Sequence, residues 1–115
     1  MAKQPITSTS APQPSGAYSQ GIAAGGFVFL SGQGPFTPDG EVPAGGFGAQ
    51  ARQTFANLAA VAAAAGGSLA DAVRVGVYLH DMGDFAEMNA IYRETFPEPL
   101  PGFLIEVDVV LHLGD

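Results

Sequence analysis

The spacing of apolar residues along the chain predicts four strands. Residues 27–31 begin with four large apolar side chains and lead into glycine-rich sequence, which favours a strand buried on both faces. A shorter strand is expected around residues 18–22, just upstream. Apolar and polar residues alternate over residues 73–79 and again over 103–111, the period-two pattern of a strand.

Helical periodicity occupies about residues 46–65. Apolar residues recur there at intervals that place them on one helix face: Ala51, Phe55, Leu58 and Ala62. Polar residues fall largely on the opposite side: Gln50, Gln53, Thr54 and Asn57. Gly66-Gly67 is expected to end this helix, because glycine accepts the left-handed cap conformation.

A second helix is expected from Asp84, a favourable N-cap residue, to Thr95. Its apolar stripe consists of Phe85, Met88, Tyr92 and Phe96. Two short segments predict turns, a tight turn at residues 37–40 and a capped turn at residues 68–71. Residues 1–14 are rich in Ser, Thr, Pro and Ala, so we expect a loose or edge segment there.

The order of these elements, β-β-α-β-α-β, predicts the fold class. It is typical of an α+β sandwich in which two helices lie on one face of a mixed sheet. A chain of 115 residues is long enough for one domain with one core, so residues 1–115 are taken as a single domain.

Composition narrows the classes of partner. The chain is 47% hydrophobic and only 13% charged, which is more apolar than a small monomer usually tolerates and indicates self-association. The net charge is −7, and the four cations are scattered, which argues against nucleic acid as a partner. No apolar run reaches the roughly 18 residues of a membrane span. With no cysteine and no secretory signal pattern, we expect a soluble cytoplasmic protein.

A few side chains could carry chemistry. Glu106 and Asp108 lie two apart on a predicted strand, so their carboxylates project from one face and could exchange a proton with a bound water. Tyr18 supplies a phenol, and Ser31 with Gly32 supplies a hydroxyl and bare backbone at a strand end. Each also has a structural interpretation: a solvated strand face, a packed ring, or a hydroxyl bonded to backbone. No spacing of His or Cys suggests a metal site, no phosphate-binding glycine motif opens a helix, and a hydrolase triad at Ser31 is not supported.

Several segments, in the same order and spacing, resemble the RidA/YjgF family of enamine and imine deaminases, also called the liver perchloric-acid-soluble protein family. The two most specific are Pro14-Ser15-Gly16-Ala17-Tyr18-Ser19-Gln20 and Ser31-Gly32-Gln33-Gly34-Pro35. Further matching segments are residues 50–58, 64–79, 81–89 and 105–108. The similarity therefore runs over nearly the whole chain, from Ala11 to Asp108.

The resemblance implies a homotrimer of chorismate-mutase-like subunits, with clefts where neighbouring subunits meet. It also implies hydrolysis of reactive 2-enamine or 2-imino acids, of the 2-iminobutanoate and 2-iminopropanoate type, to 2-keto acids and ammonia, with no cofactor. In that reaction Glu106 would position or activate the water and Tyr18 would bond to the substrate. Ser31 and the Gly32 backbone would contact the substrate too, and Asn89 would line the cleft.

One departure from the family pattern bears on catalysis. Family members carry a Pro-Ala-Arg-Ser/Thr motif after the second helix, whose arginine grips the substrate carboxylate. This chain instead runs from Pro101 directly to Gly102, roughly a dozen residues short by comparison, enough for a strand and its turn. Either the segment is truly missing, or the printed sequence omits residues that the molecule has. We favour the second, because deleting a central strand costs free energy comparable to the roughly 5–15 kcal/mol that stabilises a domain.

The departure leaves alternatives to the deaminase open. One is a trimer that keeps the fold without catalysis and binds small acids or stabilises proteins. Another is the older description of the family as ribonucleases and translation inhibitors, against which the acidic composition weighs.

Overall fold

The structure, a computed structural model, describes residues 2–98 and 108–113. Its strands are β1 (Gln4–Ile6), β2 (Gly21–Ala24), β3 (Phe27–Leu30), β4 (Ala72–Gly76) and β5 (Asp108–His112). In this part of the chain they form one sheet in the order β1-β2-β3-β5-β4. All the strand pairings it contains are antiparallel, which corrects the expected mixed sheet.

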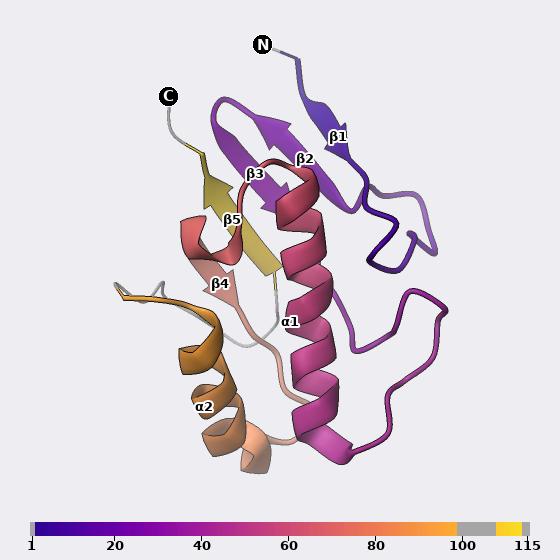
Figure 1. The fold of residues 1–115 in the computed structure, drawn as a ribbon, viewed down its shortest axis with the longest axis vertical. Coiled ribbons are helices and arrows are strands. Elements are labelled where there is room, and N and C mark those ends of the chain that lie inside the picture. Colours follow the sequence, from indigo (N-terminus) through magenta and orange to yellow (C-terminus); the bar gives the residue numbers. More distant parts are fainter. Residues whose placement is uncertain (1, 99–107, 114–115) are drawn as a thin grey trace.

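Two α-helices pack with the sheet, α1 (Gly46–Ala64) and α2 (Phe85–Thr95). Figure 1 shows α1 lying across the front of the sheet with α2 beside it. Short 3₁₀ turns precede β4 and α2, over Leu69–Asp71 and Met82–Asp84. The expected α+β fold is confirmed, and the observed order adds one strand, β1, in front of the predicted β-β-α-β-α-β.

The core lies between α1, α2 and one face of the sheet. From the sheet, Val28, Leu30, Val75, Val109 and Leu111 are buried, as alternation within each strand requires. From the helices, the buried apolar residues include Phe55, Leu58, Val61, Met88, Ile91, Tyr92 and Phe96. The three aromatic rings of this set pack together, with Phe55 edge-on to both partners. Most of both predicted helix stripes is therefore correct, whereas Phe85 is exposed.

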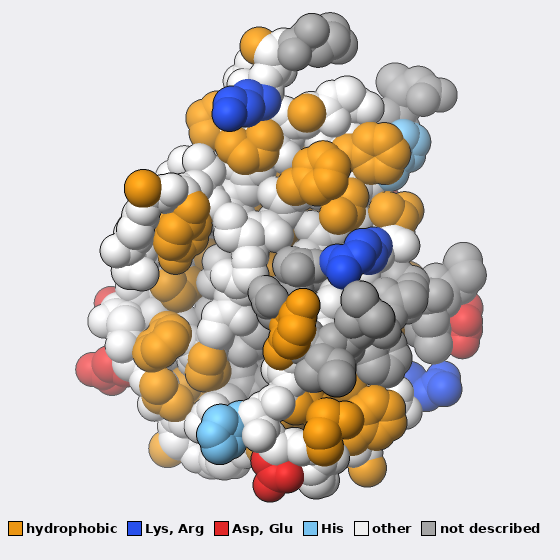
Figure 2. Space-filling model, turned by 180° about the vertical axis from the view of Figure 1, so that it is seen from behind, with side chains coloured by type: hydrophobic (Ala, Val, Ile, Leu, Met, Phe, Trp, Pro, Cys, Tyr) orange, Lys and Arg blue, Asp and Glu red, His pale blue; other side chains and the backbone are white. Residues whose placement is uncertain are grey.

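Two large aromatic side chains on the other face of the sheet are partly exposed in the single chain. Phe27 and Phe29 are 40% and 50% exposed, so the prediction that this strand is buried on both faces is wrong for one subunit. Cross-strand register places Ile22, Phe29 and Val110 in one row, with Arg74 at its end. Seen from behind in Figure 2, hydrophobic side chains gather over this surface. We call this surface the outer sheet face.

Several element boundaries differ from the sequence predictions. The second strand runs over Gly21–Ala24 rather than 18–22, and β4 ends at Gly76 rather than at residue 79. The segment expected to be loose or at an edge does contain an edge strand, β1, over residues 4–6. The predicted strand over 103–111 is described only from Asp108 onward, as β5.

Turns and caps follow the local sequence closely. Ser68 and Asp71 form a reciprocal capping box, as predicted. The turn at residues 37–40 closes with a 2.8 Å bond from the Gly40 N–H to the Thr37 carbonyl. Asp84 makes no side-chain cap bond; Asp81 instead accepts from the Gly83 N–H at 2.8 Å.

Candidate active site at the end of strand β3

Ser31 follows β3 directly and is held by the segment that joins β1 to β2. Its N–H donates to the carbonyl of Gln20 at 3.0 Å, and its hydroxyl donates to the carbonyl of Ser19. A serine hydroxyl has one proton, so this bond leaves only oxygen lone pairs for a ligand. Gly32, the next residue, is exposed and has no side chain to obstruct its backbone.

Gln20 fixes the segment that reaches Ser31. Its side chain is buried, with 2% of the residue exposed. The Oε1 atom accepts from the Ser8 N–H at 2.6 Å, and Nε2 donates to the carbonyls of Ser8 and Pro12 at 3.1 and 2.8 Å. A carboxamide that is buried and fully bonded in this way holds the N-terminal segment at one position.

Tyr18 lies in the same segment and is half exposed. Its hydroxyl accepts a long bond, 3.4 Å, from the Ser15 N–H, and its own N–H donates to the Gly16 carbonyl at 3.0 Å. The bond from Ser15 uses a lone pair of the phenol, so the phenolic proton is available to a ligand. Tyr18 and Ser31 therefore offer complementary groups, a donor and an acceptor.

Helix α1 holds the loop on the other side of Ser31. Asn57 is fully buried, and its Nδ2 donates to the carbonyls of Gly34 and Phe36 at 3.2 and 2.8 Å. Its Oδ1 accepts from Gln53 Nε2 at 2.9 Å. Asn57 lies on the polar side of the helix, as periodicity predicts, and it is buried because its partners lie in the loop above that face. Thr54, from the same predicted set, is also buried.

A cavity of about 610 Å³ opens beside this loop. One wall is the loop itself, Gln33 to Pro35, and the floor is apolar and includes Phe55, Val77 and Met88. Polar groups at the rim include His80 and Asp84. Tyr18, Ser31, Gly32 and Asn89 are not among the residues that line it. The cavity is therefore adjacent to the predicted site and separate from it within one chain.

Within a single chain, Asn89 and Tyr18 lie in separate parts of the structure. Asn89 lies on α2 and is half-buried, whereas Tyr18 lies between β1 and β2. In Figure 1 these two segments stand on opposite sides of α1. The predicted site can contain both residues only if a second copy of the chain contributes one of them. Glu106 lies outside the described residues, and its predicted role stays a prediction.

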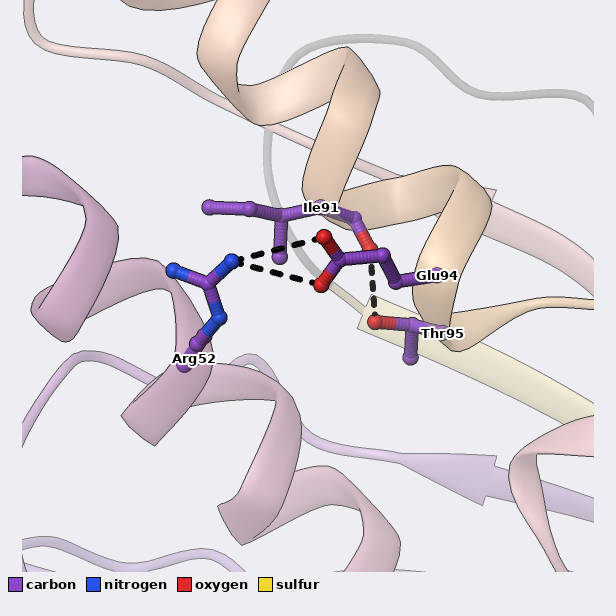
Figure 3. A network of polar contacts seen from close by, with 4 residues as sticks. All are labelled: Arg52, Ile91, Glu94 and Thr95. Carbon is purple, nitrogen blue, oxygen red and sulfur yellow. Dashed lines mark hydrogen bonds and ion pairs between the residues drawn. The ribbon is translucent and has the colours of Figure 1, made fainter.

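The arginines of the described residues lie on the helices and on β4. Arg52 Nη2 lies 3.3 and 3.5 Å from the two carboxylate oxygens of Glu94, an exposed ion pair that joins α1 to α2 (Figure 3). Arg93 is exposed on α2, and Arg74 lies on the outer sheet face. None of the three follows the second helix in the way the family motif requires.

Residues 2–98 and 108–113 offer neither a metal-binding cluster nor a membrane-spanning helix. No group of three or more His, Cys, Asp or Glu side chains gathers there in a way that could hold a metal ion. Over the same residues, neither helix combines the length and apolar character that crossing a bilayer requires.

Comparison with known proteins identifies the class of protein to which this α+β fold, with its polar loops at the end of β3, belongs. The family described as "Endoribonuclease L-PSP" matches residues 8–111. The chain belongs to this family, that of the RidA/YjgF proteins.

Individual relatives support this assignment. The 2-iminobutanoate/2-iminopropanoate deaminase of Escherichia coli is 43% identical over 94 residues, covering 81% of this chain and 73% of the relative. The RutC family protein y4sK of Sinorhizobium fredii is 37% identical over 123 residues, covering 96% of this chain and 98% of the relative. The crystal structure of RidA from the Antarctic bacterium Psychrobacter sp. PAMC 21119 superposes with a TM-score of 0.89 at 37% identity, covering 95% and 98% of the two chains.

Proposed function

We propose that this protein hydrolyses reactive 2-enamine or 2-imino acids to 2-keto acids and ammonia. The observation that carries the proposal is the Ser31 acceptor at the end of β3 and the Tyr18 donor in the segment that bonds to Ser31, in a chain similar to a protein named for this reaction. A 2-imino acid presents an N–H group and a carboxylate on adjacent carbons. One acceptor and one donor match that pair of groups.

Each residue then has a distinct part in the reaction. The Ser31 oxygen accepts from the imine N–H, and the Tyr18 hydroxyl and the exposed Gly32 N–H donate to the carboxylate. Glu106 positions a water, which adds to the imine carbon; the carbon–nitrogen bond breaks, and ammonia leaves. The products are one 2-keto acid and one ammonia for each imino acid and water, so no oxidant and no cofactor are needed.

The proposed active unit is a homotrimer. The outer sheet face exposes Phe27 and Phe29, and a second subunit would cover this apolar surface. Assembly also supplies what one chain does not, because α2, which carries Asn89, and the β1–β2 segment, which carries Tyr18, stand on opposite sides of α1. A cleft between subunits would combine Asn89 of one copy with Tyr18 of another.

A second candidate is favoured by the sequence at Pro101–Gly102. The printed chain has no arginine there to hold a substrate carboxylate. The alignment with the Sinorhizobium protein spans 123 positions, which is more than the 115 residues of this chain. That relative therefore has residues without a counterpart here. Without that arginine, the trimer would bind small acids without deaminating them.

An assay of ammonia release tests both candidates. Threonine dehydratase generates 2-iminobutanoate in place, and ammonia and 2-oxobutanoate are followed with and without this protein. We expect acceleration over the spontaneous rate. Ser31→Ala should reduce it about tenfold, the effect of losing one hydrogen bond of roughly 1–1.5 kcal/mol. Ser10→Ala, an exposed serine with no role in the proposal, should have no effect.

The outcomes separate the two candidates. No acceleration by a folded sample that still binds 2-oxobutanoate would refute the deaminase and support the binding protein. A second version of the chain, with a Pro-Ala-Arg-Thr-containing segment inserted between Pro101 and Gly102, gives a further comparison. Activity only in the chain that carries the inserted segment would show that the arginine is what the printed chain lacks for catalysis.

A further inference from the structure

Buried polar residues are few in the described part of the chain, and most of them serve one region. They are Ser8, Gln20, Thr54 and Asn57, between 0% and 9% exposed. Burying a carboxamide costs free energy unless its donors and acceptor are bonded. Among the described residues, no buried side-chain nitrogen or oxygen lacks a partner. The hydrogen-bond partners of these buried side chains therefore indicate which part of the structure each side chain holds.

The Asn57 amide donates its hydrogen bonds to a loop rather than to its own helix. Both protons of its Nδ2 are used, one for the carbonyl of Gly34 and one for that of Phe36. The bond that Oδ1 accepts from Gln53 sets which end of the amide faces the loop. Two carbonyls on either side of Pro35 are thereby tied to a residue in the middle of α1.

Gln20 also holds backbone groups in place, on the opposite side of Ser31. Its side chain ties down Ser8 and Pro12, and its main-chain carbonyl accepts the Ser31 N–H. Ser31 and Gly32 thus lie between two fixed points. Gln20 contacts Ser31 directly, and Asn57 holds Gly34, two residues beyond Gly32.

We propose that Asn57 and Gln20 are positioning residues for the site at Ser31 and Gly32, an inference that rests on the proposed function. Neither side chain is placed to react, since each is buried and its amide is already bonded. Their effect on the reaction comes from holding the Ser31 oxygen and the Gly32 backbone in place. Misplacing such groups by about 1 Å can reduce a rate 100-fold.

The test uses Asn57→Leu, which preserves the approximate size of the side chain and removes its hydrogen bonds. Thr54→Val is the matched control, because Thr54 is buried on the same helix and its hydroxyl donates to the α1 carbonyl of Gln50 rather than to the loop. Gln20→Leu repeats the test from the other side. For each full-length variant we would measure kcat/KM for 2-iminobutanoate and the affinity for 2-oxobutanoate. Hydrogen exchange is measured for residues 31–37 and for α1, at a temperature where the variant is folded.

We expect Asn57→Leu to lower kcat/KM by about 10- to 100-fold and to speed exchange at residues 31–37, with exchange in α1 little changed. Thr54→Val should stay within about twofold of the wild type in each measurement. A folded Asn57→Leu variant with unchanged kcat/KM and affinity, and only a lower melting temperature, would show a purely structural role and overturn the inference.

Failure of the proposed function would have a different signature. In that case the wild-type chain itself would not turn over 2-iminobutanoate, whether or not it binds 2-oxobutanoate, and the positioning role in catalysis would fall with it. An active wild type with an equally active Asn57→Leu variant would overturn the positioning role alone.

Discussion

Replacing Phe29 by serine tests whether the outer sheet face is a subunit interface. Phe29 is 50% exposed in the single chain, on the strand face opposite the core. A phenylalanine buries about 150–250 Å² when covered, so about 100 Å² of Phe29 is left for a partner. At about 25 cal/mol per Å², covering that area stabilises each subunit of an assembly by about 2.5 kcal/mol. In a monomer the same substitution is a surface change worth about 0.5 kcal/mol or less.

Size-exclusion chromatography with light scattering distinguishes these cases. The wild type should have three times the 11.7 kDa mass of one chain, and Phe29→Ser should shift it toward a monomer as the protein is diluted. Phe36→Ser is the control, because Phe36 is 46% exposed but lies in the loop held by Asn57. A wild-type monomer, or a Phe29→Ser trimer as stable to dilution as the wild type, would refute the interface.

Three further predictions concern stability. Gly66 has a φ of 87° at the end of α1, so Gly66→Ala should lower the free energy of unfolding by about 1–2 kcal/mol. Gly48→Ala, inside α1 where the new methyl meets only ends of flexible side chains, should leave it unchanged or raise it by up to about 1 kcal/mol. Urea titration measures both, and equal losses would contradict the role of φ. Burial raises the pKa of Tyr92 from 10.0 to about 12. The unfolded tyrosine therefore loses its proton first, and the contribution of Tyr92 to stability should be constant up to about pH 10 and fall between about pH 10 and 12. Tyr92→Phe should remove that part of the fall, and a pH profile unchanged by this variant would contradict the assignment. Arg52→Ala should cost less than about 1 kcal/mol, because the pair with Glu94 is exposed; a larger loss in thermal unfolding would indicate further contacts.

The sequence alone determined the features that depend on neighbouring residues. Apolar spacing placed α1 and α2 within about a residue of their observed ends, and Gly66 marked the end of α1 because only local backbone geometry is involved. The capping box at Ser68 and Asp71 follows from residues three apart.

Tertiary structure decided which side of each element is covered, and by what. Periodicity places Asn57 on the polar face of α1. Its burial, and its bonds to two loop carbonyls, come from the loop that packs over that face. The hydrophobicity of Phe27 and Phe29 predicts core positions, yet they are 40% and 50% exposed in the single chain. The separation of Tyr18 from Asn89 likewise depends on where the chain passes α1. Local sequence specifies the shape of a segment, whereas burial and proximity are set by contacts between residues far apart in the chain.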